Sequence, residues 1–416
     1  MSRIQQLCDG ATPHALLCCN FRHYGRIAAL YGAQVAERLF DAGRAHIQAL
    51  CPSNATLVRL DPATLGVLLP ELFDPVAVEQ LAHRCAVGWS LQTQGEHPPL
   101  LLTVVIGAAL SAAANHHKPG TEPLLSRAQL ACQAAQRRAG NHVVMASETL
   151  TRQAQLRYEL EAELLLAIER RELTAHLQPI VNLSDGRALG FECLARWPRS
   201  NGELSSPGDF LDQAIDAGLS AAIDLQVLTT CLEAAPRLND AFDSDQPLLL
   251  SANISAQLVE NPRKIEELLQ LLEQHLHSNQ VRLQLELLEE SLNESSKELD
   301  DLLNALAQLG VLLAIDDFGT GYSSLSRVHN LAINTIKVDR SFIRRINDPL
   351  KPSNHLLETL IAISHDVQSD LCAEGIESQE QQQWLLEHGC HEGQGYLFSA
   401  PLSLDAAVDY LHSQRR

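Results

Sequence analysis

The sequence lacks the marks of several classes of protein. No stretch reaches the roughly 18 unbroken apolar residues of a membrane span, and the segment MSRIQQLCDG at its start holds no apolar signal region. The ten cysteines include no Cys-x-x-Cys pair, and Cys18 and Cys19 are adjacent, which suits neither a zinc knuckle nor a disulfide framework. We therefore expect a cytoplasmic protein without a membrane span, whose thiols are reduced and mostly buried.

Basic residues are scarce relative to acidic ones. The chain has 31 Lys and Arg residues against 51 Asp and Glu residues, a formal net charge of -20 at pH 7. Binding of DNA or RNA requires a basic face, so we expect no nucleic-acid polymer as a partner. An anionic substrate would need positive charge at its own binding site, supplied by metal ions or by a few basic side chains. The 416 residues, of which 45% are hydrophobic, suit two globular domains.

A helical connector is predicted between two blocks of different character. Residues 147–171 contain neither Gly nor Pro, and Ser147 suits a helix N-cap. An apolar stripe recurs at every fourth position, namely at Leu156, Leu160, Leu164 and Ile168. We expect this helix to join a domain of residues 1–146 to one of residues 172–416. A helix that belongs wholly to one domain is the alternative.

After the connector, short β-type runs alternate with longer helical patterns. The strand candidates are AHLQPIV, LGFECLAR, PLLLSANIS, VRLQLELLEE, VLLAIDDF, TIKVDRSF, DLCAEGI and QGYLFS. Strands that alternate with helices in this way predict an α/β fold, here a (β/α)₈ TIM-type barrel. A doubly wound open sheet is the structural alternative, but the first strand is not followed by a Gly-rich phosphate loop.

Polar residues occupy one face of these strands, because side chains alternate along a strand. The polar members are Glu192 and Arg196, Ser251 and Asn253, Gln284 and Glu286, and Lys337 and Asp339. We expect this face to point into the barrel. The reactive members then lie at or near the carboxyl-terminal strand ends, where barrel enzymes build their sites.

Together the strand ends predict a metal site. The oxygen ligands that would meet at one mouth of the barrel are Glu192, Asn253, Glu286, Asp316, Asp317 and Glu374. Bare carboxylates would repel one another, so cations should be bound, and a set without His or Cys favours Mg²⁺ or Mn²⁺ over Zn²⁺. Two such ions would clamp a phosphodiester and lower the pKa of a bridging water. Lys337 would either hold that water or offset charge on the phosphoryl oxygens.

The candidates also have ordinary explanations when they are taken singly. A strand-end acid is usually solvated or caps a helix, and Gln394 between two glycines suits a loop. Adjacent Asp316 and Asp317 would point to opposite sides of an ideal strand. Both can serve one site only if the chain leaves the strand there, and the turn of Gly319-Thr320-Gly321 would allow it. The joint placement on successive strands is what predicts the site.

These residues carry a resemblance to a known family. The tripeptide Glu192-Cys193-Leu194 is accompanied by LQPIV, ANIS, LELLEES, DDFGTGYSSL, IKVDRSFI, AEGIES and QGYLFSAP, which resemble in order the motifs of the EAL phosphodiesterase domain. The similarity covers residues 172–416, and Cys193 replaces the usual Ala at a position that should face outward. The resemblance implies a barrel enzyme that hydrolyses cyclic di-GMP to linear pGpG.

The resemblance also implies roles for single residues. A first metal would be held by Glu192, Asn253, Glu286 and Asp316, and a second by Asp316, Asp317 and Glu374, giving two Mg²⁺ or Mn²⁺ ions per active site. The catalytic groups would be Glu374, Lys337 and Asp317. The substrate contacts would be Gln178, Leu194, Arg196 and Gln394. Supporting positions would be Glu289, which steadies the DDFGTGYSSL loop, together with Asp339 and Glu377.

The N-terminal block resembles the GGDEF diguanylate cyclase fold as a framework. VRLDPATLGVLLPEL parallels that family's signature hairpin, but the signature would fall on DPATL, without the glycine pair that lets a backbone approach a phosphate. Asn20 stands at the position of the family's metal aspartate, and Ala28 and Ala29 at its guanine-reading positions. We expect an α+β degenerate GGDEF-like domain without cyclase activity, which is either regulatory or only dimerising.

Three hypotheses of function follow. The first is an active phosphodiesterase for cyclic di-GMP, which the N-terminal domain modulates through the connector or a dimer. The second is a non-catalytic receptor of cyclic di-GMP, and the third is a barrel hydrolase for another phosphodiester. The expected protein partners are a second copy, in a homodimer through the EAL domain, and a signalling protein at the N-terminal domain.

Overall fold

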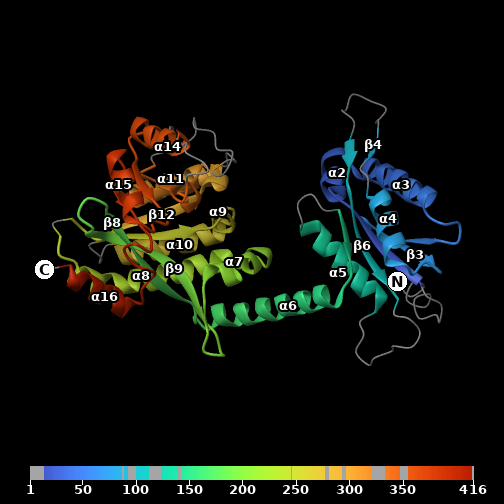
Figure 1. The fold of residues 1–416 in the computed structure, drawn as a ribbon, viewed down its shortest axis with the longest axis horizontal. Helices are drawn as coiled ribbons and strands as arrows, with labels where there is room; N and C mark the ends of the chain where they lie inside the picture. Colours follow the sequence, from blue (N-terminus) through green and yellow to red (C-terminus); the bar gives the residue numbers. More distant parts are fainter. Residues whose placement is uncertain are drawn as a thin grey trace. The chain divides into compact units, whose positions relative to one another are not determined.

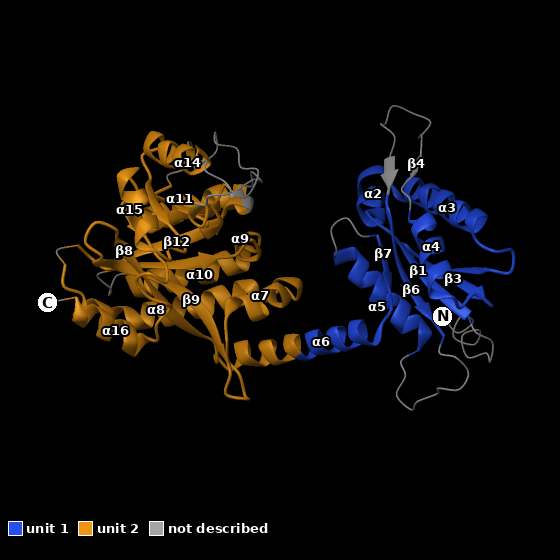
Figure 2. Cartoon of the chain, viewed as in Figure 1, with its two compact units in different colours: residues 1–159 blue, residues 160–416 orange. Residues whose placement is uncertain are grey.

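The structure is a computed structural model in which two compact units are distinguished, residues 1–159 and 160–416 (Figure 2). It describes residues 14–86, 89–91, 100–111, 123–137, 142–244, 246–276, 281–292, 297–319, 333–346 and 355–414. Within these ranges, we find no helix that combines the length and the apolar character needed to cross a membrane.

The first unit is an α+β domain built on a five-stranded sheet in the order β2-β3-β1-β6-β7. Its strands are β1 (His14–Phe21), β2 (Thr56–Asp61), β3 (Thr64–Pro70), β6 (Val104–Leu110) and β7 (Val143–Met145), and β4 (Trp89–Leu91) pairs separately with β5 (Leu100–Leu102). Its helices are α2 (Tyr24–Tyr31), α3 (Ala33–Leu50), α4 (Pro75–Cys85) and α5 (Leu124–Arg137).

The sheet of the first unit has an apolar core on each face. Phe21 of β1 and Phe40 of α3 belong to the core under α2, α3 and α4. Leu16 of β1 and Cys132 of α5 belong to the core on the other face. Leu17, next to Leu16 in β1, belongs to the first of these cores, so neighbouring residues of β1 serve opposite cores, as the alternation of a strand requires.

The helix predicted as the connector is α6 (Glu148–Glu169), and the division between the two units falls within it. Leu164 is fully buried and Ile168 packs beside it against the core of the barrel. Leu156, near the middle of the helix, is 54% exposed. The predicted apolar stripe thus packs on the barrel at its second half.

The second unit is a closed barrel surrounded by helices, so the predicted TIM-type architecture is confirmed (Figure 1). The barrel strands are β8 (Thr174–Asn182), β9 (Ala188–Pro198), β11 (Leu249–Ile254), β12 (Arg282–Leu288), β13 (Leu312–Phe318), β14 (Thr335–Val338), β15 (Asp370–Ala373) and β16 (Glu392–Gly393), with β10 (Leu204–Ser205) paired to the end of β9. The helices are α7 (Pro207–Asp216), α8 (Ser220–Ala241), α9 (Ala256–Val259), α10 (Pro262–Leu276), α11 (Lys297–Gln308), α13 (Arg340–Ile343), α14 (His355–Asp366), α15 (Gln379–Glu387) and α16 (Leu404–Ser413).

Two details of the barrel differ from the sequence-based expectation. β8 runs antiparallel to both of its neighbours, β9 and β16, and a β-hairpin rather than a helical crossover connects it to β9. The last strand is the short β16, and the predicted strand QGYLFS is a turn that follows it. Two residues are too few to give a visible alternation in the sequence.

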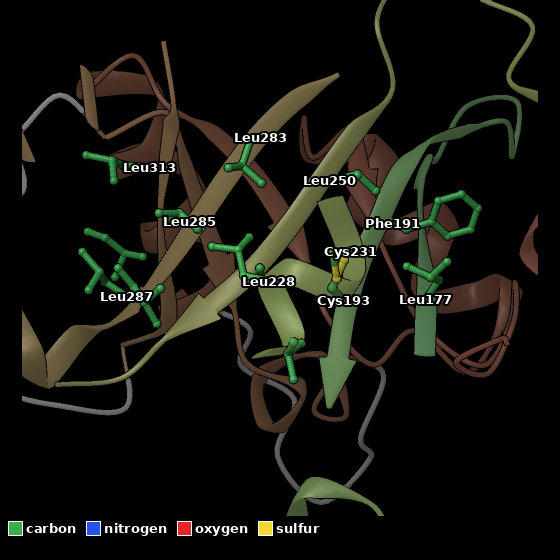
Figure 3. Close-up of a cluster of buried hydrophobic side chains, with 14 of the residues drawn as sticks. Leu177, Phe191, Cys193, Leu228, Cys231, Leu250, Leu283, Leu285, Leu287 and Leu313 are labelled. Atoms are coloured by element: carbon green, nitrogen blue, oxygen red, sulfur yellow. The ribbon is translucent and has the colours of Figure 1, made fainter. Parts of the chain in front are cut away.

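The barrel strands direct apolar side chains outward, against the helices. Figure 3 shows Leu250, Leu283 and Leu285 on neighbouring strands, and Cys193 of β9 next to Cys231 of α8. Cys193 thus faces the helices, as its place in the alternation predicts. Inside the barrel, a small apolar cluster is formed by Ile180, Leu249, Leu312 and Cys372.

Candidate active site

The structure brings the predicted acids and amides together at the carboxyl-terminal ends of the parallel strands. They are Glu192 of β9, Asn253 of β11, Glu286 of β12, Asp316 and Asp317 of β13, Lys337 of β14, Glu374 directly after β15 and Gln394 directly after β16. The site is therefore assembled from most of the strands of one barrel, as is usual for this architecture.

Lys337 lies at the centre of the acids, and its side chain is 1% exposed. Its Nζ atom lies 2.7 Å from Oε2 of Glu286 and 3.0 Å from Oε2 of Glu192. Oε1 of Glu374 is also 2.7 Å away, and Oδ1 of Asp316 is 3.8 Å away. One buried ammonium is thus shared by four carboxylates.

Burial opposes the charge on these groups, and their neighbours decide the outcome. Burial acts to lower the pKa of Lys337, but Asp316 and the other carboxylates outweigh it and raise that pKa well above its usual value. Burial, together with repulsion from Glu192, raises the pKa of Glu286. For Glu192, burial acts to raise the pKa, yet attraction by Lys337 and hydrogen bonds lower it overall.

Asp316, Asp317 and Glu374 each offer one carboxylate oxygen to a group of atoms that all lie within 4.8 Å of one another. Burial raises the pKa of Glu374 to about 8 against the attraction of Lys337. Burial and repulsion from Asp316 raise the pKa of Asp317 to about 6. The cluster holds more acids than Lys337 can neutralise, so it is suited to bind a cation.

A distortion of β13 allows Asp316 and Asp317 to serve one site. Asp317 has a φ of 55°, in the left-handed region, and the pairing of β13 with β14 shifts register between Ile315 and Phe318. Oδ1 of Asp316 accepts the backbone N–H of Asp317 at 2.9 Å. The chain therefore bends at Asp317, inside the strand, and not only at the glycines that follow.

Glu289 holds the beginning of the DDFGTGYSSL segment. Its Oε2 atom accepts the backbone N–H of Gly319 at 2.8 Å, and Glu289 is buried at the end of β12. Gly319 has a φ of 92°, which favours glycine. The segment from Thr320 onward, with Gly321, lies outside the described residues.

The two amide side chains of the cluster donate to its acids. Nε2 of Gln394 lies 2.5 Å from Oε2 of Glu192 and 3.1 Å from Oε1 of Glu374. Nδ2 of Asn253 lies 3.1 Å from Oε1 of Glu192. Oε1 of Gln394 is buried and has no hydrogen-bond donor within the described part of the chain. A buried acceptor of this kind beside acids suits a bound water, cation or ligand.

The predicted substrate contacts lie beside the acids on β8 and β9. Gln178 is the partner of Glu192 in the antiparallel pairing and is 9% exposed. Leu194 and Arg196 follow at alternate positions of β9, on the face of Glu192. The guanidinium of Arg196 donates to the carbonyl oxygen of Ala195 at 2.7 Å, and burial lowers its pKa.

The two remaining supporting candidates are placed differently. Asp339 caps α13, where its carboxylate accepts the N–H of Ser341 at 2.9 Å, and its charge adds to the raised pKa of Asp317. Glu377 instead forms an exposed ion pair with Arg344 at 3.2 Å. It is not one of the acids that contact Lys337.

Sequence reasoning missed a set of buried polar residues below the acids. Ser251 of β11, Gln284 of β12 and Thr335 of β14 point into the barrel and form hydrogen bonds that end at Glu286. The alternation had marked Ser251 and Gln284 as inward-facing. Their linkage, and the part of Thr335, depend on the register between strands that are far apart in the sequence.

Comparisons with known proteins find matches for both parts of the chain. The family model of the EAL domain matches residues 161–401, and that of the diguanylate cyclase GGDEF domain matches residues 2–142. A probable cyclic di-GMP phosphodiesterase, PdeB of Escherichia coli K12, is 34% identical over 236 residues, which are 57% of this chain and 44% of that protein. The cyclic di-GMP phosphodiesterase NbdA of Pseudomonas aeruginosa is 32% identical over 316 residues, which are 76% of this chain and 40% of that protein.

Among solved structures, the PaMucR phosphodiesterase in complex with c-di-GMP is 31% identical and has a TM-score of 0.51. The match covers 60% of this chain and 99% of that one. The chain spans less than half the length of the two curated relatives named above. It belongs to the EAL domain family, and its EAL domain follows a GGDEF-type domain.

Proposed function

We propose that this chain hydrolyses one phosphodiester bond of cyclic di-GMP and releases linear pGpG. The observation that carries the proposal is the group of acids and amides around Lys337 at the mouth of the barrel. The substrate is supported by the relatives named as cyclic di-GMP phosphodiesterases and by the neighbour solved with c-di-GMP. Release of pGpG, which keeps a 5′-phosphate, requires that the bond from phosphorus to a 3′-oxygen breaks.

The donor set fits two divalent cations of the hard type, Mg²⁺ or Mn²⁺. Four carboxylates surround the ammonium of Lys337, and Asp317 adds a fifth beside Asp316 and Glu374. The amide oxygens of the described cluster include Oε1 of Gln394, which has no hydrogen-bond donor there. The proposed holders of the first ion are Glu192, Asn253, Glu286 and Asp316, and those of the second are Asp316, Asp317 and Glu374. Bound cations would polarise the phosphoryl oxygens and make a water acidic enough to attack phosphorus.

The side chains of the chain itself would move the proton and hold the substrate. Glu374, beside Lys337 and at the edge of the acids, would exchange a proton with the attacking water. Lys337 donates to Glu374 and would hold the attacking water in the same region. Arg196 would pair with a phosphate by its planar fork, beside Gln178 and Leu194.

We propose that the GGDEF-type domain has no cyclase activity. Asn20, at the position of the expected metal aspartate, donates its amide to Oγ1 of Thr64 at 2.9 Å, so it offers no carboxylate there. The turn DPAT has no glycine, and Arg59 links the carbonyl of Pro62 to Glu37 of α3. These contacts support the loss of cyclase activity. The role proposed for the domain is regulatory or dimerising, exerted through a homodimer of the EAL domain or a signalling partner.

The proposed location is the cytoplasm. Nine cysteines are described, all of them with free thiols and eight of them buried, which suits a reducing compartment.

A nucleotide assay tests the proposal. The full chain is incubated with cyclic di-GMP in Mg²⁺, Mn²⁺ or EDTA, and the products are separated by chromatography. We expect pGpG with either metal and none in EDTA, and no cyclic di-GMP when GTP is supplied instead. Binding of cyclic di-GMP without pGpG in either metal would contradict the enzyme and favour a receptor. Faster cleavage of another phosphodiester would contradict the proposed substrate.

A further inference from the structure

Three polar side chains form a hydrogen-bonded chain beneath the acids. Oγ1 of Thr335 lies 2.8 Å from Oε1 of Gln284, and Nε2 of Gln284 lies 3.0 Å from Oγ of Ser251. Oγ of Ser251 lies 2.5 Å from Oε1 of Glu286. The chain thus connects β14, β12 and β11 and ends on a proposed metal ligand.

The three side chains are buried, so solvent water does not compete for their hydrogen bonds. Ser251 is fully buried, Gln284 is 2% exposed and Thr335 is 6% exposed. The apolar cluster of Ile180, Leu249, Leu312 and Cys372 occupies the interior of the same barrel. A polar group that loses its partner in such surroundings finds no ready replacement, so the partners should stay fixed.

Only one direction of these three hydrogen bonds lets Ser251 donate a proton to the carboxylate of Glu286. The hydroxyl of Thr335 donates to the carbonyl oxygen of Gln284, which turns the amide N–H₂ toward Ser251. Ser251 accepts that bond, and its one proton is then free for Glu286. With the amide reversed, Ser251 would donate to Gln284, and Glu286 would lose this donor.

The other oxygen of Glu286 is held by Lys337. Nζ of Lys337 lies 2.7 Å from Oε2, so each carboxylate oxygen of Glu286 has its own fixed donor. Metal affinity depends on such outer partners, because they set the orientation of the ligand before the ion arrives.

We propose that Thr335 and Gln284 are positioning residues, which act through Ser251 to orient Glu286 for a divalent cation. The inference rests on the proposed metal-dependent function and extends it to residues that would not touch the ion. Two side chains, Gln284 and Ser251, separate the hydroxyl of Thr335 from Glu286. Loss of this hydroxyl should nevertheless weaken metal binding measurably.

Thr335→Val and Thr335→Ser separate the hydroxyl from the shape of the side chain. Valine keeps the volume and removes the donor, whereas serine keeps the donor and removes a methyl group. Mn²⁺ binding to the full chain without nucleotide is measured by titration calorimetry, and thermal unfolding checks the fold. We expect the dissociation constant to rise ~10-fold in Thr335→Val, within the range found for outer partners of metal ligands. Thr335→Ser should bind as the wild type does.

A double variant tests whether Thr335 and Ser251 act on Glu286 through the same series of hydrogen bonds. Ser251→Ala removes the donor to Glu286 directly, so adding Thr335→Val to it should weaken Mn²⁺ binding no further. Independent, additive losses in the double variant would overturn the proposal. So would wild-type affinity in Thr335→Val, or an equal loss in Thr335→Ser.

The wild type separates this inference from the function on which it rests. A wild-type chain that binds no Mn²⁺ would remove the proposed metal site, and the role of Thr335 with it. A wild type that binds Mn²⁺ with unchanged affinity in Thr335→Val would overturn only the role of Thr335.

Discussion

Lys337 and Glu286 form a buried ion pair, with Nζ and Oε2 2.7 Å apart and neither side chain more than 1% exposed. The same ammonium also serves Glu192 and Glu374, so it is the internal counter-charge of the whole cluster. Removing Lys337 should therefore increase the repulsion among these acids, and adding metal ions should decrease it.

The Lys337→Met variant should be strongly destabilised without metal. Removing one partner of a buried pair leaves uncompensated charge and costs about 3–5 kcal/mol. We expect a loss of this size in chemical denaturation in EDTA, and a smaller loss in Mn²⁺, because bound ions replace the missing charge. The matched control is Arg344→Met, which breaks an exposed ion pair with Glu377 and should cost under about 1 kcal/mol. Equal losses in the two variants would contradict the role of Lys337 as counter-charge.

Asp316→Asn and Glu192→Gln should each abolish most pGpG formation while the fold survives. Each change keeps the shape of the side chain and removes one negative charge at the mouth. We expect turnover to fall ~100-fold or more, as when a group that stabilises charge in the transition state is lost. The rate is measured by chromatography in saturating Mg²⁺, and circular dichroism checks the fold.

Glu392→Gln is the control for these two variants. Glu392 is an acid of β16 whose pKa burial raises to about 7, with Asp370 and Arg282 as its charged neighbours. Its neutralisation should leave turnover close to that of the wild type. Full turnover by Asp316→Asn would contradict the metal site.

Without metal, stability should fall as the pH rises from about 5 to about 8. The pKa of Glu374 is raised to about 8 and that of Asp317 to about 6, from 4.5 and 3.8 for the free groups. The folded state therefore holds more protons than the unfolded chain in this window, and raising the pH favours unfolding. Lys337 and Glu192 do not reverse this dependence. The pKa of Lys337 is raised and that of Glu192 is lowered, and both shifts lead away from the window of pH 5 to 8.

Thermal unfolding in EDTA at several pH values measures this dependence. Saturating Mn²⁺ should reverse the slope, because the ions compete with protons for the same oxygens. The Glu374→Gln variant, which is neutral at every pH, should show a shallower slope in EDTA than the wild type. A wild-type melting temperature that rises from pH 5 to pH 8 in EDTA would contradict the raised pKa values.

The backbone at Asp317 should make glycine more stable than alanine at this position. Both Asp317→Gly and Asp317→Ala remove the carboxylate, so they differ only in the Cβ atom. At a φ of 55° an L residue raises the free energy of the folded state by roughly 1–2 kcal/mol relative to glycine. Part of this difference is offset because glycine loses more conformational entropy on folding. We expect the unfolding free energy of the glycine variant to be higher by about 1 kcal/mol, and both variants to be nearly inactive. Equal stabilities would show that the bulge relaxes when the acid is lost.

Much of the site follows from local patterns in the sequence. Alternation alone places Glu286 and Gln284 inward and Leu285 against the helices, because the period of a strand needs no knowledge of its partners. The meeting of the acids at one mouth follows from the order of strands in a parallel barrel.

Other features depend on contacts that the sequence does not express. The bulge at Asp317 arises from the pairing of β13 with β14, and the link from Thr335 to Gln284 depends on the register of two strands. Glu377 belongs to the AEGIES motif together with Glu374, yet its side chain pairs with Arg344 at the surface. The hairpin of β8 and β9 did leave a local signal, the pair Asp185-Gly186 between two β-type runs.

That hairpin bears on how the site is built during folding. A hairpin closes in roughly 1–10 μs, whereas parallel strands must wait for the helices that connect them. The short turn of residues 183–187 therefore lets Gln178 meet Glu192 through a local contact. We therefore expect Gln178 and Glu192 to pair before the barrel closes, and the strands that are distant in the sequence to add to the edge of this hairpin afterwards.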